Sequence, residues 1–575
     1  MPIWVTTFDS GVWRINTAHD SFQKSARAKM LLLSAFVSVA LSSQIGFALV
    51  PGKASSFAGS TSTFQFPPAD VTATASLINS FFPDASEVGF AGPTPTGDEA
   101  ESIATAPALS PVKGYFPLIR PETSDKKGKA FDVVDSWANL SPMQSVKSFG
   151  LDNATERIPE GCKINQVFLL HRHGARYPTS GSSPAAFASS VHSAAGNGTF
   201  IATGPLEFLN TWTYKLGAEI LTPFGREQLF NLGVGFRVKY GDLLKNFTSL
   251  PVWRTTSEER MVDSALHFAS GFFGVQSYQN SYYQVIEIEQ DGFNNTLAPY
   301  DQCPNANNNI SSLGGEATKA WNNVYLVDAQ KRFAQFLPGF NLTISDVAGM
   351  QTLCPYETVA LGYSAFCDLF TEDEWKGFAY GIDLDFWYGD GPGNPAVSAQ
   401  GIGWVHELVS RLTQTRITTF DSTVNETIVS SNITFPLNQP IYVDATHDTV
   451  ISAILPAMNF TSLSAGGPLP LDHIPENRTY KVQEISPFAS RLIGQVLSCP
   501  ASDTPTHIRW VLNDGVLPQA GITGCGDNPD GLCELDTFIA GMKQRIKEVD
   551  FDFDCFANYT FSLANDTITN GQFPK

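Results

Sequence analysis

The chain has 575 residues, of which 43% are apolar, so it can bury a large core and form two or three structural units. Its formal net charge is −20. This excess of acidic residues argues against binding to nucleic acid, because a phosphate backbone attracts basic surfaces. An anionic ligand would need a local pocket of basic residues.

Two features of the composition indicate an oxidising compartment. The chain has 8 cysteines and no C-x-x-C pair, and an even number of this kind fits four disulfides better than a metal site. It also carries thirteen N-x-[ST] sequons, from Asn139 to Asn565, which are potential acceptors of glycans. We therefore predict passage through the secretory pathway.

Residues 1–52 have the pattern of a targeting segment. Three basic residues, Lys24, Arg27 and Lys29, precede the uncharged apolar stretch 30–52, as in a signal peptide. The basic lead is long for a signal peptide, so an uncleaved anchor formed by residues 30–50, with the catalytic part outside the cytoplasm, is the alternative. Residues 53–130 are rich in Ser, Thr, Ala and Pro, which predicts a low-complexity stalk.

Residues 131–575 alternate between apolar runs and Gly/Pro punctuation, and three segments within them share a strand–loop–helix pattern. The first strand, 167–170, precedes "HRHGARYP". The second, 251–253, precedes a helix for which Thr256 and Glu259 fit a capping box and which Gly271 could end. The third, 441–443, precedes a helix whose predicted buried face is Val450, Ile451, Ile454 and Leu455. Polar residues follow each strand, where open α/β sheets bind ligands.

The polar residues after the first strand favour an anionic ligand. Arg172 and Arg176 provide bidentate donors that match a phosphate or a carboxylate. The two guanidinium charges disfavour the imidazolium form of His173, which we therefore expect to stay neutral and nucleophilic in acid. A metal site is less compatible with this segment, because the arginines would repel the cation.

Two further segments could complete such a site. Arg260 lies in the first turn of its predicted helix, where it could supply a third cation; the alternative is a surface arginine paired with Glu258 or Glu259. His447 could contact a phosphoryl oxygen, and Asp448 could deliver a proton to the departing alkoxide. Taken alone, this pair is also compatible with a simple helix cap beside an exposed imidazole.

These motifs together resemble a known family. "RHGARYP" at 172–178, "ERMVDSA" around Arg260 and "ATHDT" at 445–449 are similar to the histidine acid phosphatases, especially the secreted fungal branch that includes phytases. The resemblance covers about residues 130 to 565. It implies a large α/β domain with a mostly parallel central sheet flanked by helices, as in phosphoglycerate mutases, and a smaller α-helical domain mainly within 180–420. The active site is expected between the two.

The resemblance also implies residue roles. His173 would accept the phosphoryl group, Asp448 would donate the proton to the leaving group, and the substrate-binding residues would be Arg172, Arg176, Arg260 and His447. Implied disulfides join Cys162 with Cys499, Cys303 with Cys555, Cys354 with Cys367, and Cys525 with Cys533. No metal or organic cofactor is implied, the expected partners are small phosphate esters, and the oligomeric state stays open.

The chain departs from the family pattern where phytases tend to carry lysines. After the first motif it reads "TSGSSPAAF", and before "GDGPGN" it has Asp383 and Asp385. A many-phosphate substrate gains less from such a rim, so we predict an acid phosphatase of broad specificity, with phytate as one candidate substrate. The rival hypotheses are a phosphomutase-like enzyme, which shares the RHG motif, and an inactive binding protein on the same scaffold.

Two other segments are expected to be structural. His171 should point to the face of its strand opposite Arg172 and pack in the core. The run "DFDFD" at 550–554 alternates acidic and aromatic residues, which predicts an edge strand with one solvated face rather than a calcium site.

Overall fold

The fold is described from a computed structural model, which covers residues 122–124, 130–198, 200–308, 310–500, 502–563 and 567–574. Its centre is an eight-stranded sheet in the order β10-β8-β7-β3-β6-β4-β5, with β9 paired to β8. The expected targeting segment lies wholly outside the described residues, as does the expected stalk except for 122–124 and 130.

The parallel part of the sheet contains the strands that lead to the predicted site residues. Its members are β3 (Lys163–Arg172), β6 (Ile441–Thr446), β4 (Val252–Thr256) and β5 (Tyr283–Glu287). The antiparallel side consists of β7 (Arg491–Ser498), β8 (Thr506–Leu512), β9 (Gly515–Val516) and β10 (Cys533–Glu534). A separate hairpin pairs β1 (Glu122–Ser124) with β2 (Ala130–Asp132).

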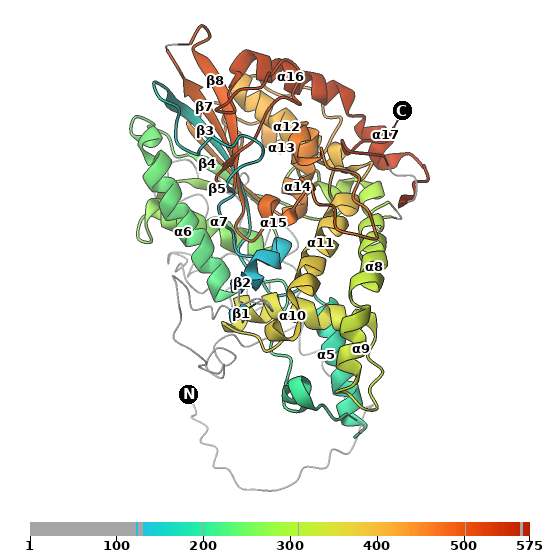
Figure 1. The fold of residues 1–575 in the computed structure, drawn as a ribbon. Helices are drawn as coiled ribbons and strands as arrows, with labels where there is room; N and C mark the ends of the chain where they lie inside the picture. Colours follow the sequence, from blue (N-terminus) through green and yellow to red (C-terminus); the bar gives the residue numbers. More distant parts are fainter. Residues whose placement is uncertain are drawn as a thin grey trace, which may run out of the picture. The chain divides into compact units, whose positions relative to one another are not determined.

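Alternate residues of β3 point to opposite faces of the sheet. Because these residues are apolar on both faces, helices cover both of them. Val167 and Leu169 pack in one core with helices α6 (Pro223–Tyr240) and α7 (Glu259–Phe273). Phe168 and Leu170 pack in another with α12 (Val397–Thr413), α14 (Asp448–Ala457) and α16 (Leu535–Glu548). The predicted α/β architecture is therefore confirmed (Figure 1).

A third hydrophobic core is formed mainly by helices and lies apart from the strands of the central sheet. It contains residues of α5 (Ser183–Gly196), α9 (Val327–Ala334), α10 (Ile344–Leu361) and α11 (Glu372–Gly389). Helix α8 (Leu313–Tyr325) packs along α11. The short helices α13 (Glu426–Val429), α15 (Val482–Ile485) and α17 (Phe551–Phe556) complete the α-helices of the described residues. Within the predicted range 180–420, α7 and α12 pack against the sheet rather than in this core, and α6 does so too except for Phe224 at its start.

Several local predictions were wrong. Thr256 is the last residue of β4 and its hydroxyl contacts Glu289, so it forms no capping box with Glu259; Glu258 occupies the N-cap position instead. Helix α7 continues past Gly271 to Phe273, and Gly274 follows with a positive φ of 91°. The "DFDFD" run forms α17 because the Asp550 carboxylate caps the Phe553 amide. His171 is buried and stacks on Phe268 as expected.

The four disulfides join the cysteine pairs that the resemblance implied. Two of them close loops of 13 and 8 residues, whereas Cys162–Cys499 and Cys303–Cys555 connect positions 337 and 252 residues apart. Among the described residues, no helix is both long enough and apolar enough to cross a bilayer.

Candidate active site

The predicted site residues meet at one edge of the sheet because their strands are parallel neighbours. Arg172 at the end of β3 pairs with Thr446 at the end of β6, and Arg254 of β4 pairs with Asp444 of β6. The chain therefore leaves each strand at the same edge. His173 follows β3 directly, and Asp448 begins α14.

The loop after β3 is held against the start of α6, and glycine is required on both sides. A Cβ on Gly174 would lie 2.2 Å from the Gly225 carbonyl oxygen, and a Cβ on Gly225 would lie 1.9 Å from the Ala175 carbonyl oxygen. The Thr222 hydroxyl also donates to the Ala175 carbonyl at 3.2 Å and caps α6 by accepting from the Gly225 amide. The glycine of "RHGAR" thus permits the close backbone approach that positions His173.

His173 is buried and its ring orientation is fixed by one hydrogen bond. Its Nδ1 lies 2.8 Å from the Gly174 carbonyl oxygen, and since a carbonyl can only accept, Nδ1 carries the hydrogen and Nε2 keeps its lone pair. Burial lowers the pKa of His173 well below 6.5, and the charges of Arg172, Arg260 and Arg176 lower it further. The neutral imidazole therefore persists into acid.

Arg172 is fully buried and links the site to two other segments. Its guanidinium donates to the Ser486 carbonyl at 2.8 Å and to the Asn139 carbonyl, and it lies 4.5 Å from the Phe488 ring centroid. Burial lowers its pKa to about 10, which leaves it charged at any acidic or neutral pH.

Asp448 faces Arg172 across the site. Its Oδ2 is 2.7 Å from Nη2 of Arg172 and accepts from Nδ2 of Asn139 at 2.9 Å. Burial alone would raise the pKa of Asp448, but the Arg172 charge and the Asn139 hydrogen bond outweigh it and lower this pKa. The Asp448 carboxylate is therefore ionised in this ion pair and partly neutralises the arginine.

Arg260 and Arg176 complete the group of cations. Arg260 pairs with Glu219 at 3.1 Å and with Glu258. Burial disfavours its charge, but the nearby carboxylates, Glu258 foremost, raise its pKa. The Arg260 charge thus acts on His173, and the pairing with Glu258 occurs in a side chain that is only 11% exposed rather than at the surface. Arg176 is half-buried and donates to the Tyr177 carbonyl at 2.9 Å.

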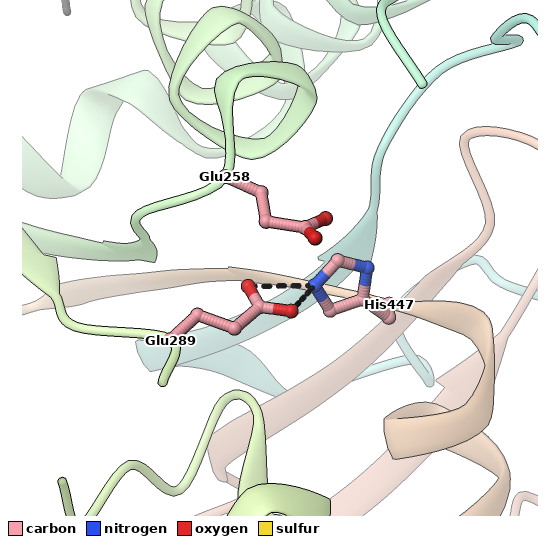
Figure 2. A group of neighbouring side chains, drawn as sticks. All are labelled: Glu258, Glu289 and His447. Atoms are coloured by element: carbon pink, nitrogen blue, oxygen red, sulfur yellow. Dashed lines mark hydrogen bonds and ion pairs between the residues drawn. The ribbon is translucent and has the colours of Figure 1, made fainter. Parts of the chain in front are cut away.

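His447 is oriented by a carboxylate that the sequence did not reveal. Its Nε2 is 3.1 Å from each carboxylate oxygen of Glu289, and its other ring nitrogen points away from Glu289 (Figure 2). Burial would raise the pKa of Glu289, but His447 and Arg260, together with the hydrogen bond from Tyr300, lower it to about 2. The His447 and His173 ring centroids are 5.7 Å apart.

All the predicted site residues are brought together, and Asn139, Glu219, Glu258, Glu289 and Tyr300 join them. Glu289 lies two residues past the end of β5, so the rule that ligands bind at strand ends could have found it. Asn139 comes from the short helix η2 (Ala138–Leu140), and in the sequence it is marked only as a sequon. Nothing in the sequence around it indicates its contact with Asp448.

The two aspartates noted before "GDGPGN" have different surroundings. Asp383 is buried, pairs with Arg478 at 2.9 Å and accepts from the Val482 amide at 2.8 Å, so it is a core residue. Asp385 is half-buried and lines a cavity of about 630 Å³ that Asn139 also lines. Burial and the charge of Asp448 raise the pKa of Asp385 to about 6.

Comparisons with known proteins identify the family. The pattern of the histidine phosphatase superfamily, branch 2, matches residues 163–513. The chain belongs to this superfamily. It is 33% identical to phytase A of Aspergillus fumigatus over 441 residues, which cover 73% of this chain and 92% of the relative. It is 34% identical to a phytase A of Aspergillus terreus over 431 residues, or 72% and 88% of the two chains.

A solved structure of the same fold supports this assignment. The crystal structure of the phytase from D. castellii superposes with a TM-score of 0.61 and 26% identity, covering 76% of this chain and 90% of that one. This histidine phosphatase is therefore a phosphate-ester hydrolase, as the motifs predicted.

Proposed function

We propose that this histidine phosphatase hydrolyses phosphomonoesters by transferring the phosphoryl group to Nε2 of His173. The observation that carries the proposal is the hydrogen bond between Nδ1 of His173 and the Gly174 carbonyl, which leaves Nε2 unprotonated beside three guanidinium groups. An attacking lone pair and a preorganised positive field are what phosphoryl transfer requires.

In the first step, Nε2 of His173 forms a bond to phosphorus while the bond from phosphorus to the ester oxygen breaks. Arg172, Arg176 and Arg260 would bind the non-bridging oxygens, over which the charge is spread in the transition state. His447 would contact the same group through Nδ1, because Glu289 occupies its Nε2. Water then attacks the phosphohistidine, which releases phosphate and restores the imidazole.

Asp448 would protonate the leaving oxygen. Its pKa is lowered in the ligand-free site mainly by Arg172. A bound phosphate would draw Arg172 away and place negative charge beside the carboxylate, and both changes raise the pKa of Asp448. A substrate that binds as the monoanion also carries one proton into the site, and this proton could protonate Asp448. Activity should therefore be highest in acid and fall above about pH 6, where phosphate monoesters lose their second proton.

Purified protein assayed with p-nitrophenyl phosphate between about pH 3 and pH 6 tests the activity. We expect turnover by the wild type and a loss of at least about a thousandfold in His173→Ala. Equal rates for the two proteins would refute the role of His173, and an inactive wild type would favour a binding protein.

Hydrolysis and a mutase reaction are distinguished by the acceptor. In ¹⁸O-labelled water with an added alcohol, we expect the label in the released phosphate and little transfer to the alcohol. Transfer to the alcohol without labelled phosphate would instead identify a mutase-like enzyme.

The substrate preference depends on the charge of the cavity that Asn139 lines. Among the described residues that line the cavity at Asn139, Lys319 is the one basic residue, and Asp385, whose pKa is raised to about 6, adds no cation near Asp448. Such a cavity gives little electrostatic attraction to a hexaphosphate. We infer that simple monoesters are hydrolysed at least as efficiently as phytate.

A lysine introduced into the cavity tests this inference. Asp385→Lys should raise kcat/KM for phytate more than for p-nitrophenyl phosphate. Asp373→Lys makes the same change at an exposed position of α11 and serves as the control. Equal effects of the two variants, or a wild-type preference for phytate, would contradict the inference.

We also infer that the protein is secreted, because four disulfides with no free cysteine among the described residues require an oxidising compartment. We infer that the N-terminal segment is cleaved; the alternative is that residues 30–50 remain as a membrane anchor. N-terminal sequencing of the exported protein distinguishes the two. A start near residue 49, after the small-x-small sequence at 46–48, supports cleavage, and an intact N-terminus in the membrane fraction supports the anchor.

A further inference from the structure

Glu258 is a carboxylate of the site that the proposed mechanism does not use. It stands at the N-cap position of α7 with its side chain 16% exposed, and it makes no capping hydrogen bond with the helix. Instead its Oε2 pairs with Nη2 of Arg260. One of its carboxylate oxygens also lies within 4.8 Å of ligand atoms of both Glu289 and His447 (Figure 2).

The two neighbouring carboxylates have unlike surroundings. Glu289 accepts hydrogen bonds from Thr256 at 2.9 Å, from Tyr300 and from His447, and its pKa is lowered to about 2. Among the described residues, Arg260 is the ion-pair partner of Glu258, and burial raises the pKa of Glu258 despite this charge. When two carboxylates face each other, the one with fewer donors takes up the proton.

The groups that face Glu258 come from every surrounding element. The positive or potentially positive ones are Arg260 of α7 and His447 at the start of α14. The negative or neutral ones are Glu289 after β5, Glu219 before α6, and Tyr300 of the short helix η6 (Pro299–Gln302). Protonation of Glu258 would remove one negative charge from this group and weaken its hold on Arg260.

A bound cation is the other way to balance these carboxylates. The ligand atoms of Glu258, Glu289 and His447 have the spacing of a metal site. However, the Arg260 guanidinium pairs directly with Glu258, and this fixed charge would repel a metal ion placed there. A proton on Glu258 meets no such repulsion.

We propose that Glu258 is a positioning residue that controls Arg260: when ionised it holds the guanidinium in a competing ion pair, and when protonated it releases Arg260 to the phosphoryl group. This inference rests on the proposed function, because it takes Arg260 as a phosphate ligand. It adds a second cause of acidic activity, which acts on binding rather than on the proton donor.

Phosphate binding measured without turnover tests the inference. The Kd of inorganic phosphate is determined by calorimetry at about pH 5 and about pH 7.5 for the wild type, Glu258→Gln and Glu258→Ser. The ionisation of phosphate itself is common to all proteins, so the ratio of Kd values between variants isolates Glu258. Glu259→Gln removes a carboxylate from the next position of the same helix turn and is the matched control.

From about pH 5 to about pH 7.5, we expect the Kd of the wild type to increase about tenfold more than the Kd of either Glu258 variant. This is the effect expected for the loss of one charged hydrogen-bond partner. KM should follow Kd, while kcat in acid changes by less than about threefold. Parallel curves for wild type and Glu258→Gln, the same flattening in Glu259→Gln, or weaker binding after EDTA treatment would overturn the inference. An Arg260→Ala variant that binds phosphate as tightly as the wild type would refute the phosphate-binding role of Arg260 itself.

Discussion

At the scale of single residues, the site is a set of ion pairs that a phosphate group would have to exchange. Asp448 neutralises Arg172, and Glu219 and Glu258 neutralise Arg260. Each carboxylate lowers the affinity for an anion but also keeps a buried guanidinium from being left unpaired. Asp448, the proposed proton donor, is therefore also the counter-ion of Arg172, which is proposed to bind the phosphate.

Substitution of the proposed proton donor Asp448 should lower kcat by an amount that depends on the leaving group of the ester. Asp448→Asn keeps the size of the side chain but cannot donate a carboxyl proton, so kcat for an alkyl phosphate should fall by about 10²–10⁴-fold. For p-nitrophenyl phosphate, whose phenolate leaves without help, the loss should be much smaller. Steady-state kinetics on the two substrates measures this difference, and equal losses would argue against proton donation by Asp448.

The charged residues that follow the predicted strands could be identified from the sequence, but the residues that contact them could not. His173 and Arg172 are adjacent in a motif, so their proximity required no fold. Asn139 and Asp448 are 309 positions apart, and Glu289 carries no motif, so their contacts depend on the strand order. Burial, which is the largest cause of the low pKa of His173, was likewise not evident from the adjacent arginines.

At the scale of elements, a buried ion-pair network fixes the strands beneath the site. Arg254 of β4 donates to Asp444 of β6 at 2.8 Å, to Glu407 of α12 at 2.7 Å and to Glu287 of β5 at 3.0 Å. Arg411 of α12 also pairs with Asp444 at 2.7 Å. The network therefore holds together the strands that lead to Arg260, His447 and Glu289.

Loss of Arg254 should destabilise the protein strongly. Arg254→Met would leave several carboxylates buried with fewer cations, which costs about 3–5 kcal/mol. Unfolding in urea measures this change. Lys331→Met, which removes an exposed ion pair with Asp328, should change the free energy of unfolding by less than about 1 kcal/mol. Similar effects of the two substitutions would contradict a stabilising role for the network.

Hydrophobic patterns located these elements but not their limits. The buried face predicted for α14 is confirmed, since Val450, Ile451, Ile454 and Leu455 are all buried. Strand β4 extends to Thr256 because Thr255 and Thr256 pair with β5 and the Thr256 hydroxyl bonds to Glu289. These tertiary contacts outweigh the local capping signal of Thr256 and Glu259.

At the scale of the whole molecule, buried acids set the pH range of stability. Burial raises the pKa of Glu287 to about 8 and that of Glu357 to about 7, from 4.5. Arg254 and Arg411 balance only two of the three carboxylates in the network, so a proton on Glu287 neutralises the third. Glu289 behaves oppositely, since its pKa is about 2.

The free energy of unfolding should therefore be greatest in mild acid. Between pH 4.5 and about 8 the native state holds protons on Glu287 and Glu357 that the unfolded state has lost, so these two groups make stability fall as the pH rises. Burial lowers the pKa values of His171 and His173, which offsets this fall below about pH 6.5, where the unfolded state protonates its histidines. Below pH 4.5 the unfolded state protonates Glu289 first, so stability also falls towards pH 2. Urea midpoints across this range measure the profile. A midpoint that rises steadily to pH 8 would contradict these assignments.

The central claim is that His173 carries the phosphoryl group, and the intermediate itself tests it most directly. A phosphomonoester is mixed with excess enzyme, the reaction is stopped in alkali, where phosphohistidine survives, and the digested protein is analysed by mass spectrometry. We predict one phosphoryl group on the peptide that contains His173, and none on that peptide in His173→Ala. Turnover with no phosphorylated His173, or with the phosphoryl group on another residue, would contradict the account.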